Sequence, residues 1–152
     1  MPASVTSRDR GARALVERLT SLRASSIDVG VLGERAAEAY EDGLTVAQVM
    51  EWAELGLGQP QRSWLRAWAD EHAAEIRERI RTEVVRLART GTQRQALERI
   101  GAWMVGSIRQ RIADHIDPPN ADSTVDRKGS STPLIDSGQA RSSIASRANV
   151  TG

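Results

Sequence analysis

The stretch PPNADSTVDRKGSSTPLIDSGQARSSI, from Pro118 to Ile144, organises the rest of the chain. Its two leading prolines end the helix that the preceding sequence predicts, because proline lacks an N–H and disfavours helical geometry in the residue before it. The short polar residues that follow, among them Asn120 and Asp122, can hydrogen-bond to nearby backbone and shape a loop without a core. The pattern predicts an extended loop or arm over 118–132, then a C-terminal turn and strand over 133–152.

The composition is that of one globular domain spanning residues 1–152. A chain of 152 residues, of which 39% are hydrophobic and 27% charged, is long enough to bury a single core. Only 3% of the residues are aromatic and none is Phe, so Ala, Leu, Ile and Val must fill that core. We expect the four tryptophans to anchor it: Trp52, Trp64, Trp68 and Trp103.

Charge and cysteine content narrow the classes of partner. The formal net charge of +1 gives no overall field that would favour nucleic acid or a membrane surface. No apolar run reaches the length of a transmembrane helix, and the N-terminus lacks the apolar segment of a signal peptide, so we expect neither a membrane partner nor export. The absence of cysteine excludes disulfides and thiolate metal sites.

The first third of the chain predicts a helix followed by a strand. Apolar residues recur at steps of three and four over residues 8–25, which indicates an amphipathic N-terminal helix. Ile27, Val29 and Val31 then alternate with polar residues or glycine, the pattern of a half-buried strand over Ser26 to Leu32. The acidic, Ala-rich stretch from Glu34 to Gly43 is interpreted as a surface excursion with room for a helical turn.

A short helix from Thr45 to Leu55 is predicted next. The Thr45 hydroxyl can accept the free N–H groups of the first turn, and Gly56 tolerates the positive φ that commonly ends a helix. Gly56 and Gly58 form a Gly-x-Gly pair, but it follows a helix and lacks a third glycine. A flexible loop is therefore favoured over a nucleotide site.

Two long helices follow and are expected to form a hairpin hinged at Gly91. The first runs from Ser63 to Gly91, and the second is capped by Thr92 and runs to about Ile116. The first should turn these residues inward: Trp64, Leu65, Trp68, Ile76, Ile80, Val84 and Leu87. The second carries a narrow apolar stripe, either a core face or a helix–helix seam within a ring, made of Leu97, Ile100, Met104, Ile108 and Ile112. Gly101 and Gly106 inside it each cost about 1 kcal/mol against Ala, which favours close packing against a neighbour.

The charged face of the first long helix has two interpretations. Glu75 and Arg79 stand in the favourable i,i+4 order, which contributes only a few tenths of a kcal/mol and suits a solvated face. The alternative is a charge seam between subunits of an oligomer.

The predicted fold class is α+β. Asp136 or Ser137 can cap a turn of helix from Gln139 to Ser142, after which Ile144 to Val150 can form a terminal strand. This strand and the early strand can pair in one small antiparallel or mixed sheet. The two long helices and the N-terminal helix would pack on it.

The sequence contains no pattern typical of an enzyme or a cofactor site. His72 and His115 lie far apart on predicted helices, outside any metal-binding spacing, and are interpreted as surface or helix-end residues. The serines lack the nucleophile elbow that a Ser–His–Asp site needs. We therefore expect no catalytic residues, no metal and no cofactor.

The C-terminal stretch resembles the signature of a family of tailed-bacteriophage virion proteins, variously called neck, tail-completion or minor tail proteins. In that family a PPN element, a Thr and a Lys-Gly precede a P-L-I-D-T-G-x-L-x-x-S-I pattern. The counterparts here are Pro118, Pro119, Asn120, Thr124, Lys128, Gly129, Pro133, Leu134, Ile135, Asp136, Gly138, Ser143 and Ile144, with Arg141 inside the same block. Ser137 replaces the usual Thr, and Ala140 replaces the usual Leu.

An upstream block is similar to the same family. Its E-F-G turn and its Pro-x-Arg-Ser/Pro-aromatic-Leu-Arg element correspond to Glu54, Leu55, Gly56, Pro60, Arg62, Ser63, Trp64, Leu65 and Arg66. Leu55 replaces the aromatic residue, and Trp64 keeps one. The early strand is also similar, so the resemblance runs from about Ser26 to the end of the chain.

The resemblance implies a non-enzymatic virion protein at the head–tail junction. Such proteins assemble in the host cytoplasm and lie at the neck or the top of the tail. The implied partners are further copies in a six-fold or twelve-fold ring, with neighbouring neck, tail-terminator, tail-tube or head–tail connector proteins. The arm at 118–132 would then become ordered against neighbours, although a plain flexible loop is the alternative.

A second interpretation is a nucleic-acid-binding or DNA-channel-lining module of the same particle. Packaged DNA passes through the neck, and its transient contacts would be Arg109 and Arg111 on the second long helix, with Arg94 near its start. The near-zero net charge argues against tight binding.

Overall fold

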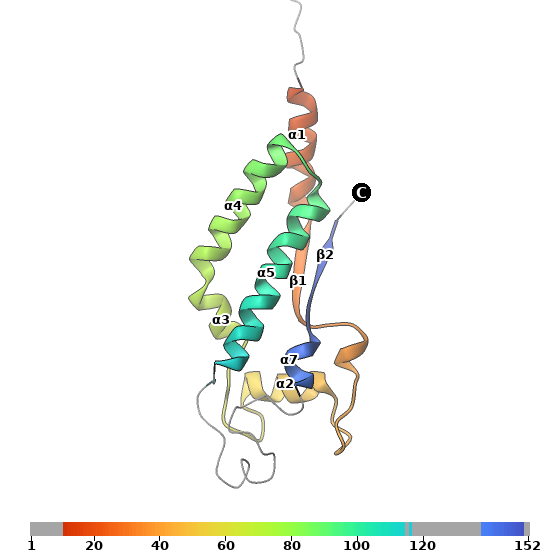
Figure 1. The fold of residues 1–152 in the computed structure, drawn as a ribbon, viewed down its shortest axis with the longest axis vertical. Helices are drawn as coiled ribbons and strands as arrows, with labels where there is room; N and C mark the ends of the chain where they lie inside the picture. The colour runs from red at the N-terminus through yellow and green to blue at the C-terminus, as the bar shows by residue number, and fades with distance from the viewer. Residues whose placement is uncertain (1–10, 115, 117–137, 151–152) are drawn as a thin grey trace, which may run out of the picture.

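The computed structural model describes residues 11–114, 116 and 138–150, and these form a small α+β fold (Figure 1). The elements in chain order are α1 (Ala12–Ser21), the 3-10 turn η1 (Leu22–Ala24), β1 (Ser26–Val31), the 3-10 turn η2 (Glu34–Ala36), α2 (Val46–Leu55), α3 (Arg66–Glu71), α4 (Ala73–Arg89), α5 (Gln93–Ala113), α7 (Gln139–Ser143) and β2 (Ile144–Asn149). The predicted fold class is confirmed.

The sheet consists of the two strands expected from the sequence. β1 and β2 pair antiparallel, from Ser26 opposite Asn149 to Val31 opposite Ile144. At the open end the Asn149 side-chain amide donates to Asp28 Oδ2 at 3.0 Å and to Ser26 Oγ at 3.2 Å. The pairing therefore joins an early segment to the C-terminal one and closes the fold.

Helix α5 covers the sheet, and one of its glycines allows the close approach. A Cβ added to Gly101 would lie 2.6 Å from Ser146 Oγ and 2.9 Å from Ser146 Cβ, so no side chain fits there. The prediction of close packing is thus right for Gly101. It is wrong for Gly106, which is exposed and would place a Cβ in open space.

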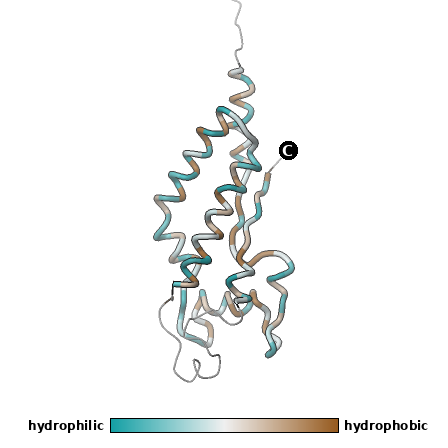
Figure 2. Tube along the Cα trace, viewed as in Figure 1, coloured by the Kyte–Doolittle hydropathy of each residue, from teal (hydrophilic) through white to brown (hydrophobic). Residues whose placement is uncertain are grey.

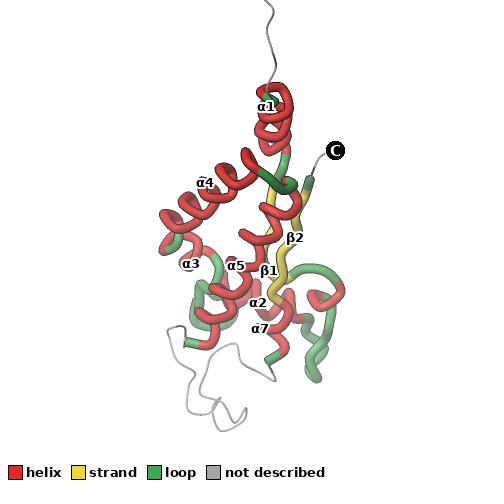
Figure 3. The backbone as a smooth tube through the Cα atoms, turned by 45° about the horizontal axis from the view of Figure 1, so that its top comes forward, coloured by secondary structure: helices red, strands yellow, loops and turns green. Residues whose placement is uncertain are grey.

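The hairpin of α4 and α5 is confirmed, with Gly91 at a φ of +96° between them. Thr92 and Gln95 form a capping box at the start of α5. Helix α4 packs on α5 and α1, and α5 lies between α4 and the sheet (Figures 1 and 3). Of the three helices predicted to pack on the sheet, α5 is thus the one that covers it, whereas α4 and α1 pack mainly on other helices.

The first long helix differs from its prediction in two respects. Regular helix begins at Arg66 instead of Ser63, and the chain bends at His72, whose φ of −99° and ψ of 8° separate α3 from α4. Ile80, expected to face inward, is 44% exposed, because the described elements that pack on α4, mainly α5 and α1, do not cover this side chain. Leu87, nearer the hairpin turn, is buried as predicted.

The main core lies where α2, α3, α5 and α7 meet, at the end of the molecule opposite α1 (Figure 1). Thr45 caps α2 through a capping box with Gln48, as expected for Thr45. The buried cluster consists of Val46, Met50, Ala53, Trp64, Trp68, Ile108, Ile112, Ile116, Ala140 and Ile144. Figure 2 shows α4, in contrast, as a largely hydrophilic helix. Of the four tryptophans expected in the core, Trp64 and Trp68 are buried, whereas Trp52 and Trp103 are half-buried.

Helix α1 stands at the other end and has no buried residue. It packs on α4, and Val16 is 61% exposed. The predicted N-terminal helix over 8–25 is confirmed from Ala12 to Ala24, counting η1, while residues 8–10 lie outside the described part. Within the described ranges, no helix combines the length and the apolar character needed to cross a bilayer.

Candidate functional site

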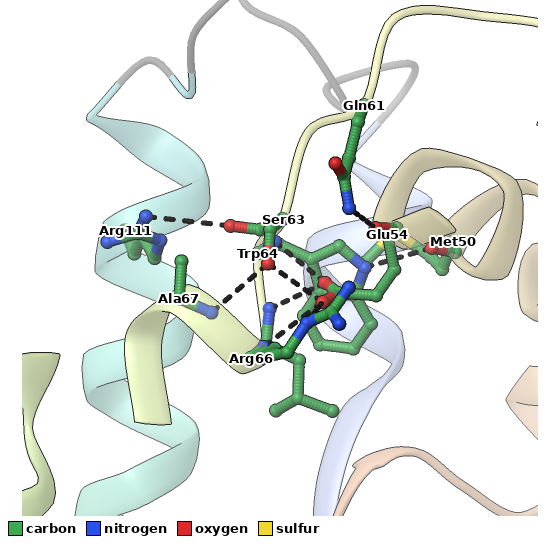
Figure 4. Close-up of polar contacts among 9 residues, drawn as sticks. Met50, Glu54, Gln61, Ser63, Trp64, Arg66, Ala67 and Arg111 are labelled. Carbon is green, nitrogen blue, oxygen red and sulfur yellow. Dashed lines mark hydrogen bonds and ion pairs between the residues drawn. The ribbon is translucent and has the colours of Figure 1, made fainter. Parts of the chain in front are cut away.

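The upstream block of the resemblance folds around one carboxylate, that of Glu54 at the end of α2 (Figure 4). Its Oε1 accepts from the Ser63 hydroxyl at 2.8 Å and the Arg66 N–H at 3.2 Å. Its Oε2 accepts from the N–H groups of Trp64 and Leu65 at 2.8 and 2.9 Å. The first N–H groups of a helix have no partner within the helix, so an anion here stabilises the start of α3.

This arrangement explains why helix α3 starts three residues later than predicted. The backbone N–H groups ahead of Arg66 are turned toward the Glu54 carboxylate. The Ser63 hydroxyl still assists, because it accepts from the N–H of Ala67 at 3.1 Å. Ser63, predicted as the first residue of this helix, therefore acts in its capping and shares that role with Glu54.

A tight return loop brings Glu54 and α3 together. Gly56 ends α2 with a φ of +73°, and a Cβ there would lie 2.9 Å from that of Gln61, so the turn requires glycine. Gln61 donates from its side chain to the Glu54 carbonyl at 2.9 Å, and the Arg62 N–H donates to the Ala53 carbonyl at 2.7 Å. These two hydrogen bonds thus fix the end of the loop on the last turn of α2.

Two further residues of the upstream block lie in this loop and differ in burial. Pro60 is exposed at the outer part of the loop. Arg62 is only 6% exposed, and this burial lowers the pKa of its guanidinium, because a charged group is disfavoured away from water. Gln59 accepts from Arg62 at 3.5 Å.

Trp64 joins the upstream block to the downstream block. It is 4% exposed, and its indole N–H donates to the Met50 carbonyl at 2.9 Å. Its ring belongs to the same buried cluster as Ala140 and Ile144. The two segments that carry the resemblance, about 80 residues apart, therefore meet in one core, and the position where Ala140 replaces the usual Leu is fully buried.

The downstream block forms the short helix α7 and its junction with β2. Gly138 stands at the N-cap with a φ of +71°. Ser143 is 1% exposed and its hydroxyl donates to the Ala140 carbonyl at 2.7 Å, while Ile144 is fully buried. Arg141 is exposed. Within this one turn of helix, Ala140 and Ser143 are thus buried, whereas Arg141 and Ser142 are exposed.

Two arginines hold the end of α7 and were not anticipated in that role. Arg109 on α5 donates to the Ser142 and Ile144 carbonyls at 3.2 and 2.8 Å. Arg35, within η2, donates to the Ser142 carbonyl at 3.1 Å. Cations suit the negative end of a helix, where carbonyls lack partners. No local pattern connects residues 107 positions apart, so this clamp has no signal in the sequence.

The DNA contacts expected at Arg109 and Arg111 are not supported by their surroundings. Arg109 is engaged at α7, and Arg111 forms an ion pair with Glu71 and donates to the Ser63 carbonyl at 3.5 Å. Both side chains thus hold the fold together. Arg94 remains exposed at the start of α5.

An aromatic cluster fixes α3 and α4 on α5. His72 stacks on Trp68 with ring centroids 5.2 Å apart, and Trp103 lies 5.8 Å from Trp68. The Trp68 indole N–H donates to Ser107 Oγ at 2.8 Å, and the Arg79 guanidinium lies 4.1 Å above the Trp103 ring. His72 thus lies at a helix end, as predicted. His115 is outside the described residues.

An open hollow of about 970 Å³ lies beside this cluster, between α3 and the last turns of α5. Its wall is half polar and includes Arg66, Asp70, Gln110, Arg111 and Asp114. Among the described residues, no group of three or more His, Cys, Asp or Glu side chains could hold a metal ion. At the Glu54 site each carboxylate oxygen already accepts two hydrogen bonds, which is the arrangement of a structural joint.

The remaining residues of the downstream block lie outside the described residues. They are Pro118, Pro119, Asn120, Lys128, Gly129, Pro133, Leu134 and Asp136, together with the arm expected at 118–132 and the expected cap at Ser137. The residues that flank this segment, Ile116 and Ala140, both belong to the main core. The described residues on the two sides of this segment therefore lie at the same end of the molecule.

Comparison with known protein-family models, with curated proteins and with solved structures found no match.

Proposed function

We propose that this chain is a non-enzymatic structural protein of a tailed-bacteriophage particle, which forms a ring at the head–tail junction. The observation that supports the proposal is the meeting of the two resembling blocks. Glu54 bonds to the N–H groups of Trp64 and Arg66 in one block, and Trp64 shares a buried cluster with Ala140 and Ile144 of the other, which makes one joint at a single end of the fold. Blocks matched independently in sequence are thereby explained by one structural role.

The residues of this joint are held in a fixed arrangement by the contacts among them. Its polar groups bond to one another, as at Glu54, and its apolar groups, among them Trp64, Ala140 and Ile144, belong to the main core. Both flanks of the segment 117–137 are anchored on that core. If residues 118–132 act as the arm expected from the sequence, such a fixed base is what a ring subunit needs to reach neighbouring neck, tail-terminator, tail-tube or connector proteins.

The test is genetic. In a phage genome that encodes this chain, replacement of its gene by a stop codon should yield filled heads and separate tails, counted by electron microscopy. Restoring the chain from a plasmid should restore joined particles. A stop mutant that yields the normal proportion of joined, infectious particles would overturn the proposal.

A second experiment addresses the arm. Replacement of residues 118–132 by a short Gly-Ser linker should leave the far-ultraviolet circular dichroism spectrum and the unfolding midpoint of the purified protein nearly unchanged, yet fail to restore joined particles. If the replacement unfolds the protein, the segment is part of the core structure and not an arm.

The DNA-lining alternative keeps less support. Two of its three expected contacts, Arg109 and Arg111, bond within the fold. Binding of the purified protein to duplex DNA that weakens steeply with salt would be needed to restore it.

A further inference from the structure

Helix α4 and the start of α5 form an edge with an excess of positive charge. Residues 73–99 contain seven arginines and four glutamates, a net charge of +3. Arg77, Arg81 and Arg89 stand at steps of four or eight residues on one face of α4, with Val85, 52% exposed, between them. We refer to Arg77, Arg81, Val85 and Arg89 as the basic stripe. All four side chains are exposed.

The glutamates of α4 leave part of this charge uncompensated. Glu75 pairs with Arg79, Glu78 with Arg81, and Glu83 with both Arg86 and Arg99. Within the described part of the chain, neither Arg77 nor Arg89 has an ion-pair partner. Two of the three cations in the basic stripe are thus available to an acidic surface.

Such a surface exists in the same chain. Residues 34–42 contain four carboxylates and one arginine, a net charge of −3. We refer to Glu34, Glu38, Glu41 and Asp42 as the acidic loop, and all four are exposed. The single cation, Arg35, is directed to the Ser142 carbonyl and so contributes to the fold.

The acidic loop has a defined shape. The Tyr40 N–H donates to the Leu44 carbonyl at 2.8 Å, the Gly43 N–H donates to the Tyr40 carbonyl at 2.9 Å, and Ala39 forms a β-bridge with Thr45. Asp42 Oδ1 accepts from the Leu44 N–H at 3.1 Å. Little conformational entropy would therefore be lost if this loop docked on a partner.

The two charged surfaces lie on opposite edges of the molecule. Helix α5 separates α4 from the sheet, and the acidic loop lies beyond the sheet, beside α2 and α7. Figures 1 and 3 place α4 at the left edge and the loop that precedes α2 at the right edge in both views. The two surfaces of one copy are therefore too far around the body to neutralise each other.

We propose that the acidic loop of one copy docks on the basic stripe of the next. Complementary charges of opposite sign on two different surfaces of one chain define a head-to-tail contact, and repetition of such a contact closes into a ring if the rotation permits. Val85 and the exposed alanines Ala37 and Ala39 offer an apolar centre between the charges. The inference rests on the proposed ring for its closed geometry, and it adds which two surfaces form the contact.

Two charge-reversed variants test the contact. R77E/R89E makes both edges acidic, and E34R/E41R makes both edges basic, while none of these four side chains has a hydrogen bond or ion pair among the described residues. Subunit number is measured by native mass spectrometry and light scattering at about 50 mM and about 500 mM salt, because screening weakens exposed charge contacts. Circular dichroism verifies that each variant is folded.

Each variant alone should remain monomeric under conditions where the unmodified protein associates, with an apparent Kd at least about tenfold weaker. A one-to-one mixture should associate again, because every acidic edge then meets a basic one in alternating copies. R18E/R147E and E17R/E51R are matched controls, with the same change of charge at exposed positions elsewhere, and should associate as the unmodified protein does.

Three results would overturn the inference. The first is an unmodified protein that stays monomeric at about 100 µM and low salt, where such contacts are strongest. The second is a pair of variants that associate normally. The third is a loss of DNA binding in R77E/R89E with unchanged association, which would assign the basic stripe to nucleic acid. The stop-codon experiment is independent: a ring that forms through this contact in a chain dispensable for head–tail joining would retain the contact and reject the proposed function.

Discussion

The two ends of the molecule are built differently. At the α2–α3–α7 end, carboxylate, indole and guanidinium groups bond to buried or half-buried backbone, and the core residues Val46, Ala53 and Ile144 are fully buried. At the α1–α4 end, α1 buries no residue, and ion pairs on exposed side chains prevail. One end is therefore held by the main core and by satisfied polar groups. The other end combines a smaller set of buried residues, such as Leu87 and Leu97, with ion pairs that water and salt can weaken.

This difference predicts which substitutions should lower the free energy of unfolding and which should weaken association. A residue at the packed end should affect the free energy of unfolding strongly, whereas a residue of the same type at the charged end should affect it little and association more. The following substitutions measure that contrast in the monomer, by chemical denaturation at low protein concentration.

The largest effect is expected for Glu54→Ala. It removes the acceptor of four hydrogen bonds and leaves the N–H groups of Trp64, Leu65 and Arg66 without a protein partner. We expect the free energy of unfolding to fall by about 3 kcal/mol. Glu54→Gln, which keeps one oxygen and places an amide NH₂ near N–H donors, should lose less but still be clearly destabilised. A loss below about 0.5 kcal/mol for Glu54→Ala would show that the carboxylate is not the cap of α3.

The next effect comes from two glycines of one helix and has opposite signs. Gly101→Ala places a Cβ within 2.9 Å of both Ser146 Cβ and Ser146 Oγ, and should cost about 2 kcal/mol. Gly106→Ala meets open space on the same helix and should stabilise by about 0.5–1 kcal/mol through helix propensity.

A third variant makes the glycine comparison decisive. Ser146→Gly removes the side chain that the new Cβ would meet, so Gly101→Ala should be much less costly in that background. If the cost is unchanged, the close contact between α5 and β2 is not its cause.

These cases also show what the sequence could predict. Thr45 and Thr92 as caps, Gly91 as hinge and the tight packing of Gly101 follow from local pattern or helix propensity, and all are present. They depend on residues close in sequence or on a single helix face, which is the information that periodicity carries. The pairing of the two strands joins distant segments, and it was expected because two strands under a layer of helices can share one small sheet.

The rest depends on contacts between distant segments, which periodicity does not encode. Glu54 was marked only through the resemblance, because nothing in its neighbourhood shows that residues 63–66 will fold back on it. The clamp of Arg35 and Arg109 on α7, and the bend at His72, likewise require the tertiary arrangement. Arg109 and Arg111 were expected to contact DNA from the second long helix, whereas the bonds that engage them within the fold, to Ile144 and to Glu71, also join distant segments.

A smaller effect is expected at Glu83, whose side chain is only 12% exposed and joins α4 to α5 through Arg99, with bonds of 2.6 to 3.1 Å. The hydrogen bonds from Arg99 hold the pKa of Glu83 below its ordinary value of 4.5. A carboxyl whose pKa is lower in the folded state stabilises the fold above its unfolded pKa, and this contribution is lost as the pH falls through the folded pKa.

Glu83→Gln should therefore cost about 1 kcal/mol at pH 7, and the difference from the unmodified protein should shrink as the pH falls below about 4.5. Denaturation curves from pH 7 to pH 3 measure it. A difference that is constant over this range would mean that the loss is one of packing and not of charge.

The smallest effect is expected for substitution of Glu78. Its ion pair with Arg81 has the same sequence spacing as the pair of Glu83 with Arg86, so the two pairs differ mainly in exposure. Glu78 and Arg81 stand at i,i+3 on α4, as do Glu83 and Arg86, but the Glu78 and Arg81 side chains are 63% and 73% exposed. Water and salt screen such a pair, so Glu78→Gln should change the free energy of unfolding by at most about 0.3 kcal/mol. If Glu78→Gln costs as much as Glu83→Gln, burial is not what separates the two pairs, and the charged edge holds the monomer together as well as offering a surface to the next copy.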